Sequence, residues 1–371
     1  MAERPALWVS TSTHTRGGIA TYVRDMQKTP LWSEWNVRHI PTHRDGSALD
    51  KVIAFASGAV CFVVEVLRSK PSVVHLHTSA DTSFIRKCVL FWIGRLAGVP
   101  VVVHVHASDF PGYHDQSPQL VRRIIVGTLT NADAVVALGE VLAQRLRVIA
   151  PNARITAIPN AVRLAERVTQ PTADEPVRVI FLGRIGDRKG TFRLLDAWAE
   201  LVGEPGFETE WGTRATLTIA GDGEVDRAQR HIEELRLTHC VRLSEWLPPE
   251  AVVKLLDEAH VLVLPSRNEG QPMAVLEAMA RGLCVVASDV GGLREMIGDG
   301  GGLVVPPDDV TAIADALRTV IRDGDLRAEL GSVAHKRVES RFDLYSTSRR
   351  ISALYAEISA HDRALMNAAR N

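Results

Sequence analysis

Short apolar runs alternate with helix-length segments along most of the chain. The pattern is clearest in Val261 to Gly292, where VLVLP and CVVAS are unbroken apolar runs typical of parallel strands buried on both faces. We expect the helix between them to run from about Pro272 to Arg281, because proline suits a first helical turn and Gly282 follows the segment. These residues therefore predict a strand–helix–strand unit. Its polar loop SRNEGQP follows the first strand, at the edge of the sheet where ligands bind in open α/β folds.

The same alternation occurs in both halves of the chain. Strand-like runs are ALWVSTS, PSVVHLHTS, VPVVVHVHAS and NADAVVAL in the first half, and VRVIFLG, ATLTIAGDGE and HCVRLSEWL in the second. The polar, proline-bracketed segment Leu164 to Pro176 is typical of a linker. We therefore predict an α/β protein with two Rossmann-like, doubly wound parallel sheets, in domains 1–168 and 177–341, and a ligand cleft between them. A helix at about 344–360 closes the chain.

Composition and charge narrow the class of protein. A chain of 371 residues is too long for a single domain with one ordinary hydrophobic core. Its composition, 46% hydrophobic and 23% charged residues, is that of a soluble globular protein. The first 150 residues carry 16 Lys+Arg against 11 Asp+Glu, whereas the rest carry 27 against 33. The mildly basic first half would suit an anionic membrane surface or an anionic acceptor, although ordinary scatter explains it too. Nucleic acid is not an expected partner.

The cysteines and the apolar windows bear on location. Four dispersed cysteines, Cys61, Cys88, Cys240 and Cys284, predict neither a disulfide framework nor a thiolate metal site, and we expect them in the core. The start, MAERPALWVSTS, lacks the apolar core of a signal peptide, so we expect a cytosolic protein.

No membrane span is predicted from the apolar windows. Val52 to Leu67 and Cys88 to Leu96 are too short or interrupted for a span of about 20 residues, so both are expected to be helices packed on a sheet. The basic, amphipathic stretch FIRKCVLFWIGRLAG leaves peripheral membrane contact through the first domain open.

One candidate site is the loop GRIGDRKG, which follows the first strand of the second domain. Its cations Arg184, Arg188 and Lys189 suit a diphosphate, because an arginine binds two phosphate oxygens at once and a lysine adds a compact charge. The order of residues excludes a GxxxxGK[ST] loop. A solvated charged turn is the alternative for the octapeptide alone.

Two carboxylates flank the next predicted helix. Glu269 precedes it and Glu277 lies within it, so their Cα atoms would be about 12 Å apart along a helix. That exceeds the carboxyl separation in glycoside hydrolases, and excludes an acid and base pair of that kind. One carboxylate near a transferred sugar and another on a ribose hydroxyl fit better, although two surface glutamates remain the alternative. The helix start itself favours a phosphate.

The first domain offers glycines and histidines. Gly17 and Gly18 sit between the first strand and a helix, where they allow the backbone to approach an anion or form a tight turn. Two strands end in His-x-His, at His75 with His77 and at His104 with His106. A metal site is disfavoured because no Asp, Glu or Cys stands at ligand spacing, and strand-end histidines often form polar lids. His106 precedes Ser108 and Asp109 at the end of its strand, and we expect it to be a catalytic or donor-contacting histidine.

Taken together, four segments resemble a known family. GRIGDRKG, AGDGE, EGQPMAVLEAMARGLCVVASDVGG and GGLVVPPDD, in this order, resemble the donor domain of retaining glycosyltransferases of family 4, the group 1 family with the GT-B fold. The GG loop and HASDF resemble motifs of the acceptor domain, and the closing helix resembles one that crosses back onto it. The resemblance covers nearly the whole chain.

The resemblance implies roles in donor binding. Arg184 and Lys189 would hold the donor diphosphate and neutralise the leaving group without a metal or other cofactor, and Glu277 would bind the ribose. Glu269 would contact the transferred sugar, and the backbone after it would meet sugar hydroxyls and phosphate. That backbone comprises Gly270, Gln271, Pro272 and Met273. These residues depart from the commoner EGFG-type loop, which leaves the donor sugar open.

The first domain would complete the site. Gly18, next to Gly17, would approach the diphosphate, and His106 would contact the 6-hydroxyl region of the sugar and support an oxocarbenium-like transition state. The expected function is therefore a metal-independent, retaining transfer of a hexose from a UDP- or GDP-type sugar to a hydroxyl of a glycan or lipid-linked acceptor. Polysaccharide or glycolipid synthesis at the inner face of the membrane is the expected setting. A nucleotide-sugar 2-epimerase, a phosphorylase and a noncatalytic nucleotide-sugar-binding partner are the alternatives.

Overall fold

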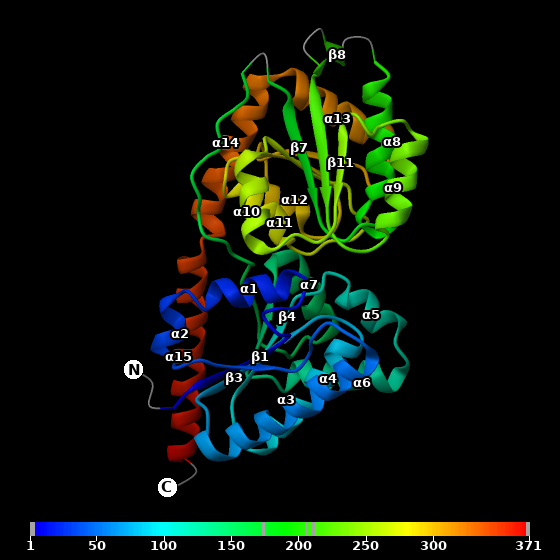
Figure 1. Ribbon diagram of the computed structural model, residues 1–371. Helices are drawn as coiled ribbons and strands as arrows, with labels where there is room; N and C mark the ends of the chain where they lie inside the picture. The colour runs from blue at the N-terminus through cyan, green and yellow to red at the C-terminus, as the bar shows by residue number, and fades with distance from the viewer. Residues whose placement is uncertain (1–3, 173–174, 205–206, 210–211, 369–371) are drawn as a thin grey trace. The chain divides into compact units, whose positions relative to one another are not determined.

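The computed structural model describes residues 4–172, 175–204, 207–209 and 212–368. Two compact units divide the chain: Met1–Ala161 with Leu344–Asn371 form the first, and Val162–Asp343 form the second. Each unit has its own six-stranded sheet in which all neighbouring strands are parallel (Figure 1). The predicted α/β architecture with two doubly wound parallel sheets is confirmed.

The sheet of the first unit has the strand order β2-β1-β3-β4-β5-β6. Its strands are β1 (Ala6–Ser10), β2 (Arg38–Pro41), β3 (Val73–Thr78), β4 (Val101–Val105), β5 (Ala134–Ala137) and β6 (Ile155–Ala157). Its helices are α1 (Gly18–Met26), α2 (Pro30–Glu34), α3 (Ala48–Ser69), α4 (Thr82–Leu96), α5 (Phe110–Gln116), α6 (Gln119–Thr130), α7 (Gly139–Ile149) and α15 (Leu344–Ala368).

The two faces of this sheet have different chemistry. One face is aliphatic and forms a core with side chains of α3 and α4, including Phe62 and Phe91. On the other face Trp8 of β1 pairs in register with His75 of β3, and His77 with His104 of β4. The helix α15 packs against α1, α2 and β3, which places the end of the chain in the first unit.

The sheet of the second unit has the strand order β11-β10-β7-β12-β13-β14, and β8 pairs separately with β9. The strands are β7 (Val177–Leu182), β8 (Glu208–Thr209), β9 (Gly212–Thr213), β10 (Ala215–Ala220), β11 (Val241–Ser244), β12 (Val261–Leu264), β13 (Cys284–Ser288) and β14 (Leu303–Val305). The helices are the 3₁₀ turn η1 (Asp187–Lys189), α8 (Thr191–Val202), α9 (Val225–Glu234), α10 (Pro249–Glu258), α11 (Met273–Met279), α12 (Leu293–Ile297), α13 (Val310–Arg322) and α14 (Gly324–Arg341).

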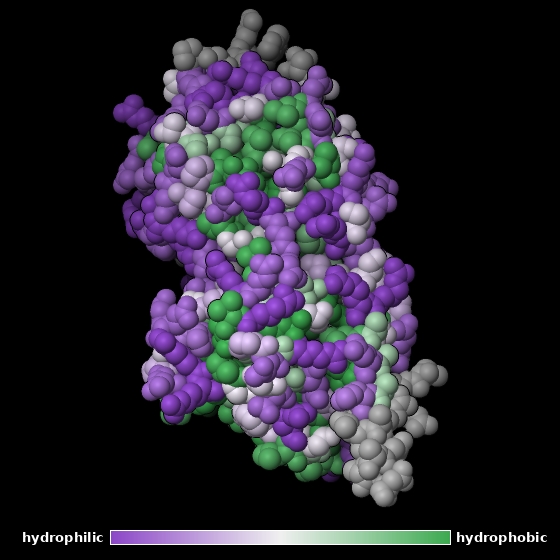
Figure 2. Space-filling view, turned by 180° about the vertical axis from the view of Figure 1, so that it is seen from behind, coloured by the Kyte–Doolittle hydropathy of each residue, from purple (hydrophilic) through white to green (hydrophobic). Residues whose placement is uncertain are grey.

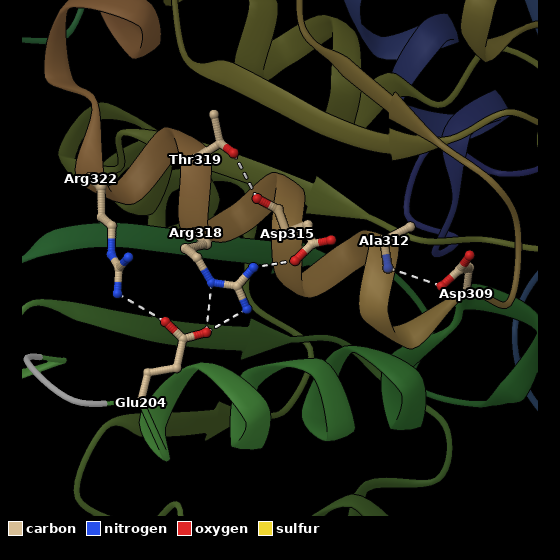
Figure 3. Close-up of polar contacts among 7 residues, drawn as sticks. All are labelled: Glu204, Asp309, Ala312, Asp315, Arg318, Thr319 and Arg322. Carbon is tan, nitrogen blue, oxygen red and sulfur yellow. Dashed lines mark hydrogen bonds and ion pairs between the residues drawn. The ribbon is translucent and has the colours of Figure 1, made fainter.

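Side-chain contacts fix where helices begin and how they pack. The carboxylate of Asp309 accepts a hydrogen bond from the Ala312 N–H at 2.9 Å and caps α13 (Figure 3). Further along α13, Arg318 and Arg322 bind Glu204, which follows α8, so the ends of two neighbouring helices are tied together (Figure 3). Seen from behind, hydrophilic residues cover much of each unit, and hydrophobic patches lie among these residues on both units (Figure 2).

Several local predictions are wrong. The segment PGYHDQSPQ, whose proline and glycine are typical of a loop, lies largely in α5, because Pro111 occupies the first turn, where its missing N–H costs no hydrogen bond. Cys61 is exposed rather than in the core. The apolar window predicted to be too short for a membrane span lies in α3, which is long and apolar enough for one by length and composition.

The segment predicted as a linker belongs to the second unit in the structure. Within it, Ala165 N donates to the carbonyl of Ala280 at 3.2 Å and Val168 N to that of Arg281 at 2.9 Å. The chain leaves the first unit earlier, at Ala161.

Candidate functional site

The loop between β7 and α8 owes its shape to Gly190. This residue has a φ of 75°, and a Cβ atom there would collide with the carbonyl oxygen of Pro265 at the end of β12. Arg267 N also donates to the carbonyl of Arg188 at 2.9 Å. The two loops that carry the predicted basic and acidic residues therefore lie against each other at the carboxyl ends of β7 and β12.

At this point Lys189 and Glu269 form an ion pair. The side chains are only 14% and 7% exposed. The same carboxylate oxygen, Oε1, accepts a hydrogen bond from the Ser266 hydroxyl at 2.7 Å. Two residues that are 80 positions apart in sequence are thus brought together, and each charge is compensated by the other in a largely dry environment.

A further loop supports Glu269 from behind. Gly291 follows β13 with a φ of 55°, and a Cβ atom there would collide with the carbonyl oxygen of Glu269. Gly292 N donates to that same oxygen at 3.4 Å. The backbone of Glu269 is therefore fixed between two loops, which limits how far its carboxylate can move.

Arg184 differs from Lys189 because it is exposed. It lies two residues after the end of β7, and within the described ranges it makes no ion pair and no side-chain hydrogen bond. Arg184 therefore adds an exposed guanidinium to the loop that also carries Lys189. This suits an anionic group with several oxygens, such as a diphosphate.

The remaining donor-binding candidates lie on or before α11. Gln271 and Met273 have buried side chains, and Pro272 caps the helix, which begins at Met273 and has seven residues. Gly270 lies just before them and is partly buried. Glu277 is partly buried within α11, and its carbonyl accepts a hydrogen bond from Arg281 Nη1 at 3.1 Å.

In the first unit, Gly17 and Gly18 are exposed at the start of α1. Gly17 has a φ of 125°, and a Cβ atom there would meet nothing within 4 Å. The backbone conformation, rather than a lack of space, is therefore the reason for glycine at this position.

Four histidines, together with Tyr22 and Tyr355, fill the polar face of the first sheet. His77 Nδ1 lies 2.9 Å from His106 Nε2, and His75 Nε2 lies 3.2 Å from His104 Nδ1. Tyr355 of α15 accepts a hydrogen bond from Trp8 Nε1 at 2.8 Å and bonds to His75 through its hydroxyl. His75, His77 and His104 are fully buried rather than lids at the strand ends.

Burial keeps these imidazoles neutral. It lowers the pKa of His75 and of His106 to about 3, and His106 adds to the effect at His75. It also lowers the pKa of His77 and of His104 well below the usual range. At neutral pH, His106 can therefore act through hydrogen bonds but not as a cation.

The protonated nitrogen of His106 follows from its partner. His77 Nε2 is buried and has no hydrogen-bond partner within the described ranges. A buried N–H left without a partner is costly, so the proton of His77 belongs on Nδ1, from which it donates to His106 Nε2. The proton of His106 then lies on Nδ1, which makes this atom a hydrogen-bond donor.

Nitrogen atoms of His75, His77 and His104 lie within 4.8 Å of one another, close enough to hold a metal ion. Their rings are stacked, with planes 15° apart for His75 and His77 and 22° for His75 and His104. Lone pairs lie in the ring planes, so stacked rings direct them past a common point. The geometry therefore fits a hydrogen-bonded stack better than a metal site.

Sequence reasoning missed three residues of these sites. Ser266 and Gly291 hold Glu269 in place, and His77 holds His106 in place. Ser266 stands in a local sequence that does not indicate this contact. Gly291 and His77 lie on a different loop or strand from the residue that each supports. The paired glycines of ASDVGG were the one available signal for Gly291.

Two adjoining family models match the chain. "Glycosyl transferases group 1" matches residues 162–337, and "Glycosyl transferase 4-like domain" matches residues 30–161. Curated relatives include the alpha-D-kanosaminyltransferase of Streptomyces kanamyceticus, 27% identical over 82% of this chain and 83% of that protein. The D-inositol 3-phosphate glycosyltransferase of Corynebacterium jeikeium is 34% identical over 57% of this chain, and the match spans about half (52%) of that relative.

Solved structures show the same fold. Sucrose-phosphate synthase of Thermosynechococcus elongatus matches with a TM-score of 0.79 and 19% identity, over 96% of this chain and 100% of that one. Anabaena HepE in complex with UDP-glucose matches with a TM-score of 0.74 and 19% identity, over 95% of this chain and 100% of that one. The chain belongs to the group 1 glycosyltransferases and has the GT-B fold.

Proposed function

We propose that this protein transfers a hexose from a nucleoside diphosphate sugar to a hydroxyl of a glycan or lipid-linked acceptor, with retention and without a metal. The observation that carries the proposal is the Lys189–Glu269 ion pair, together with the exposed Arg184 in the same loop as Lys189. A bound donor can separate the Lys189 cation from the Glu269 carboxylate. Arg184 supplies a second cation that forms no ion pair within the described residues.

Donor binding would redistribute these contacts. Arg184 and Lys189 bind the diphosphate, and Lys189 then exchanges its carboxylate partner for phosphate oxygens. Glu269 is left with the Ser266 hydroxyl and accepts a hydrogen bond from a sugar hydroxyl. Glu277 binds the ribose, and the backbone from Gly270 to Met273 meets the sugar and phosphate. HepE, a structural neighbour solved with UDP-glucose, supports a UDP-type donor.

The proposed step needs no enzyme nucleophile. The bond between the anomeric carbon and the phosphate oxygen breaks, and the leaving diphosphate takes the bonding electrons. The acceptor oxygen bonds to the anomeric carbon on the same face, and its proton passes to a phosphate oxygen. Arg184 and Lys189 stabilise the negative charge that develops on the leaving group, which is where fixed cations contribute most to the rate.

His106 is assigned to the 6-hydroxyl region of the sugar, and Gly17 with Gly18 to the diphosphate. A neutral imidazole with its proton on Nδ1 offers the 6-oxygen a hydrogen bond without adding positive charge beside an oxocarbenium-like centre. The expected location is the cytoplasm, at the inner face of a membrane, in polysaccharide or glycolipid synthesis. The basic balance of the first 150 residues supports an anionic surface as partner.

The first test is a thermal-shift panel with UDP-, GDP- and ADP-glucose, followed by transfer assays of Lys189→Met and Glu269→Gln. We expect each variant to lose about 10²- to 10³-fold in kcat/KM, as when a group that stabilises transition-state charge is removed. Lys254→Met is the matched control, because Lys254 forms an exposed lysine–glutamate pair with Glu258 in the same unit. Near-normal transfer by Lys189→Met would refute the site. Product formed from the donor without any acceptor would indicate an epimerase instead.

A further inference from the structure

The outer surface of α3 is an apolar stripe with nothing covering it among the described residues. Only Gly58, Phe62 and Val66 of this helix are fully buried on the sheet side. Six large apolar side chains on the outside are between 38% and 68% exposed, namely Leu49, Val52, Ile53, Val60, Val64 and Leu67. Their spacing of three and four residues places them along one side of the helix. Soluble monomers rarely expose continuous apolar surface of this kind.

The neighbouring helix extends the same surface. α4 packs against α3 and exposes Ile85, Val89, Trp92 and Leu96, which are between 40% and 86% exposed and again lie along one side of the helix. Both helices lie on the aliphatic face of the first sheet (Figure 1). Trp92 has an apolar ring and one polar N–H, a combination enriched where protein meets the lipid headgroups. We call these ten exposed side chains the α3–α4 surface.

The uncompensated charges of α3 and of its C-terminal cap, Lys70, are positive. The two acidic residues of α3 are neutralised, Asp50 by Arg44 and Glu65 by Arg38. Lys51, Arg68 and Lys70 form no ion pair with any carboxylate in the part of the chain that the structure describes. Arg68 and Lys70 flank the apolar stripe at the C-terminal end of α3, and this arrangement of cations and apolar side chains is complementary to an anionic lipid bilayer.

Two other arrangements fit less well. If α3 crossed the membrane, it would carry β2 and β3 to opposite sides, yet both strands pair with β1 in one sheet. If a second copy of the chain covered the surface, Arg68 and Lys70 of both copies would be brought together without acidic partners. A helix lying in the membrane interface keeps the sheet intact and satisfies the cations.

We infer that the α3–α4 surface binds anionic membranes, with the apolar stripe in the headgroup region and the cations on lipid phosphates. This rests on the proposed membrane location but not on the donor chemistry. It also enlarges the predicted contact, which was confined to FIRKCVLFWIGRLAG, by adding α3 as its larger part.

Vesicle co-sedimentation of the full chain, without donor, tests the inference. We expect binding to phosphatidylcholine vesicles that contain phosphatidylglycerol, and at least tenfold weaker binding to pure phosphatidylcholine. Val52→Gln with Val60→Gln should weaken binding at least tenfold. Val253→Gln, an equivalent change at a 46% exposed valine of α10 in the second unit, should leave it unchanged. Each of Arg68→Ala and Lys70→Ala should weaken binding about fivefold and reduce its salt dependence.

Three outcomes would overturn the inference: no binding by the wild type, unchanged binding by Val52→Gln with Val60→Gln, or a dimer in light scattering that this variant abolishes without any vesicle binding. The last would identify a second copy as the occupant. The thermal shift produced by UDP-glucose should be the same in the variant and the wild type, so a failed membrane site remains distinguishable from a failed donor site.

Discussion

The two units differ in how they hold most of their buried histidines and lysines, although both are parallel sheets wound by helices. The first unit buries neutral histidines in a stack on one face of its sheet and leaves Lys87 with a hydroxyl, that of Thr42, as its hydrogen-bond partner. The second unit places its buried lysine, Lys189, against a carboxylate at the end of the sheet. A paired charge can be exchanged for a ligand's charge, whereas neutral imidazoles can only offer hydrogen bonds. This difference supports the proposal that the second unit binds the anionic part of a donor.

The largest expected effect is acid unfolding that begins in the first unit. His75, His77, His104 and His106 have folded-state pKa values far below the unfolded value of about 6.5, so the unfolded chain binds protons first as the pH falls. Stability is therefore lost as the pH falls below about 6.5, by roughly 2 kcal/mol for each histidine between pH 7.5 and 5. Hydrogen exchange, corrected for its intrinsic pH dependence, should show β3 and β4 losing protection before β7 and β12. Equal loss in both units would break the comparison.

The next effect is a change of stability with pH that is caused by the buried Lys87 of the first unit. Burial, with a smaller contribution from Arg86, lowers the pKa of Lys87 to about 7, so only the unfolded chain keeps that proton between pH 7 and 10. Wild-type stability should therefore rise by about 2 kcal/mol from pH 7 to 9, and Lys87→Met should remove this rise. Urea midpoints at the two pH values measure it, with Lys254→Met as an exposed-lysine control. An unchanged slope in Lys87→Met would show that another group titrates.

A smaller effect should separate positioning from chemistry within the first unit. His77 contacts His106 and holds its tautomer, so His77→Leu should lower kcat about tenfold with little change in KM. His77→Asn should recover most of the loss, because its amide can donate from nearly the same place as Nδ1. Equal losses in both variants, accompanied by a lower melting temperature, would indicate packing alone.

The smallest expected effects should be the same in both units. Ser47 caps α3 by accepting a hydrogen bond from Asp50 N at 3.2 Å, and Asp309 caps α13 in the same way (Figure 3). Ser47→Ala and Asp309→Ala should each cost about 1 kcal/mol in the free energy of unfolding, measured by urea denaturation. A difference of several kcal/mol between them would show that the units differ in more than their buried charges.

The fold could be predicted from the sequence because parallel strands buried on both faces read as unbroken apolar runs, as VLVLP and CVVAS do. Helix α5 could not be predicted from the sequence, because Pro111 and Gly112 are typical of a loop. Only the structure shows that Pro111 lies in the first turn of a helix. The exposure of α3 could not be predicted either. The sequence of an apolar helix is the same whether its outer side is covered by another element or exposed to solvent.

The site was partly predictable for a similar reason. Arg184, Lys189 and Glu269 stand in short motifs whose residue types state their chemistry. The contacts of Ser266 and Gly291 with Glu269 depend on how loops meet after different strands, and no local pattern carries that information. The bond between His77 and His106 depends in the same way on the register of β3 against β4.

The path of the chain has a consequence for how such proteins can change. The second unit starts at Val162 and ends at Asp343, and these two residues are bridged, with Val162 N bonded to the Phe342 carbonyl at 3.0 Å. The second unit is therefore an insertion with adjacent ends in the sequence of the first unit. The first unit is complete only once α15 has been synthesised. Such an insertion can be exchanged without breaking the first unit's own contacts. Donor and acceptor preferences could then be inherited from different ancestors.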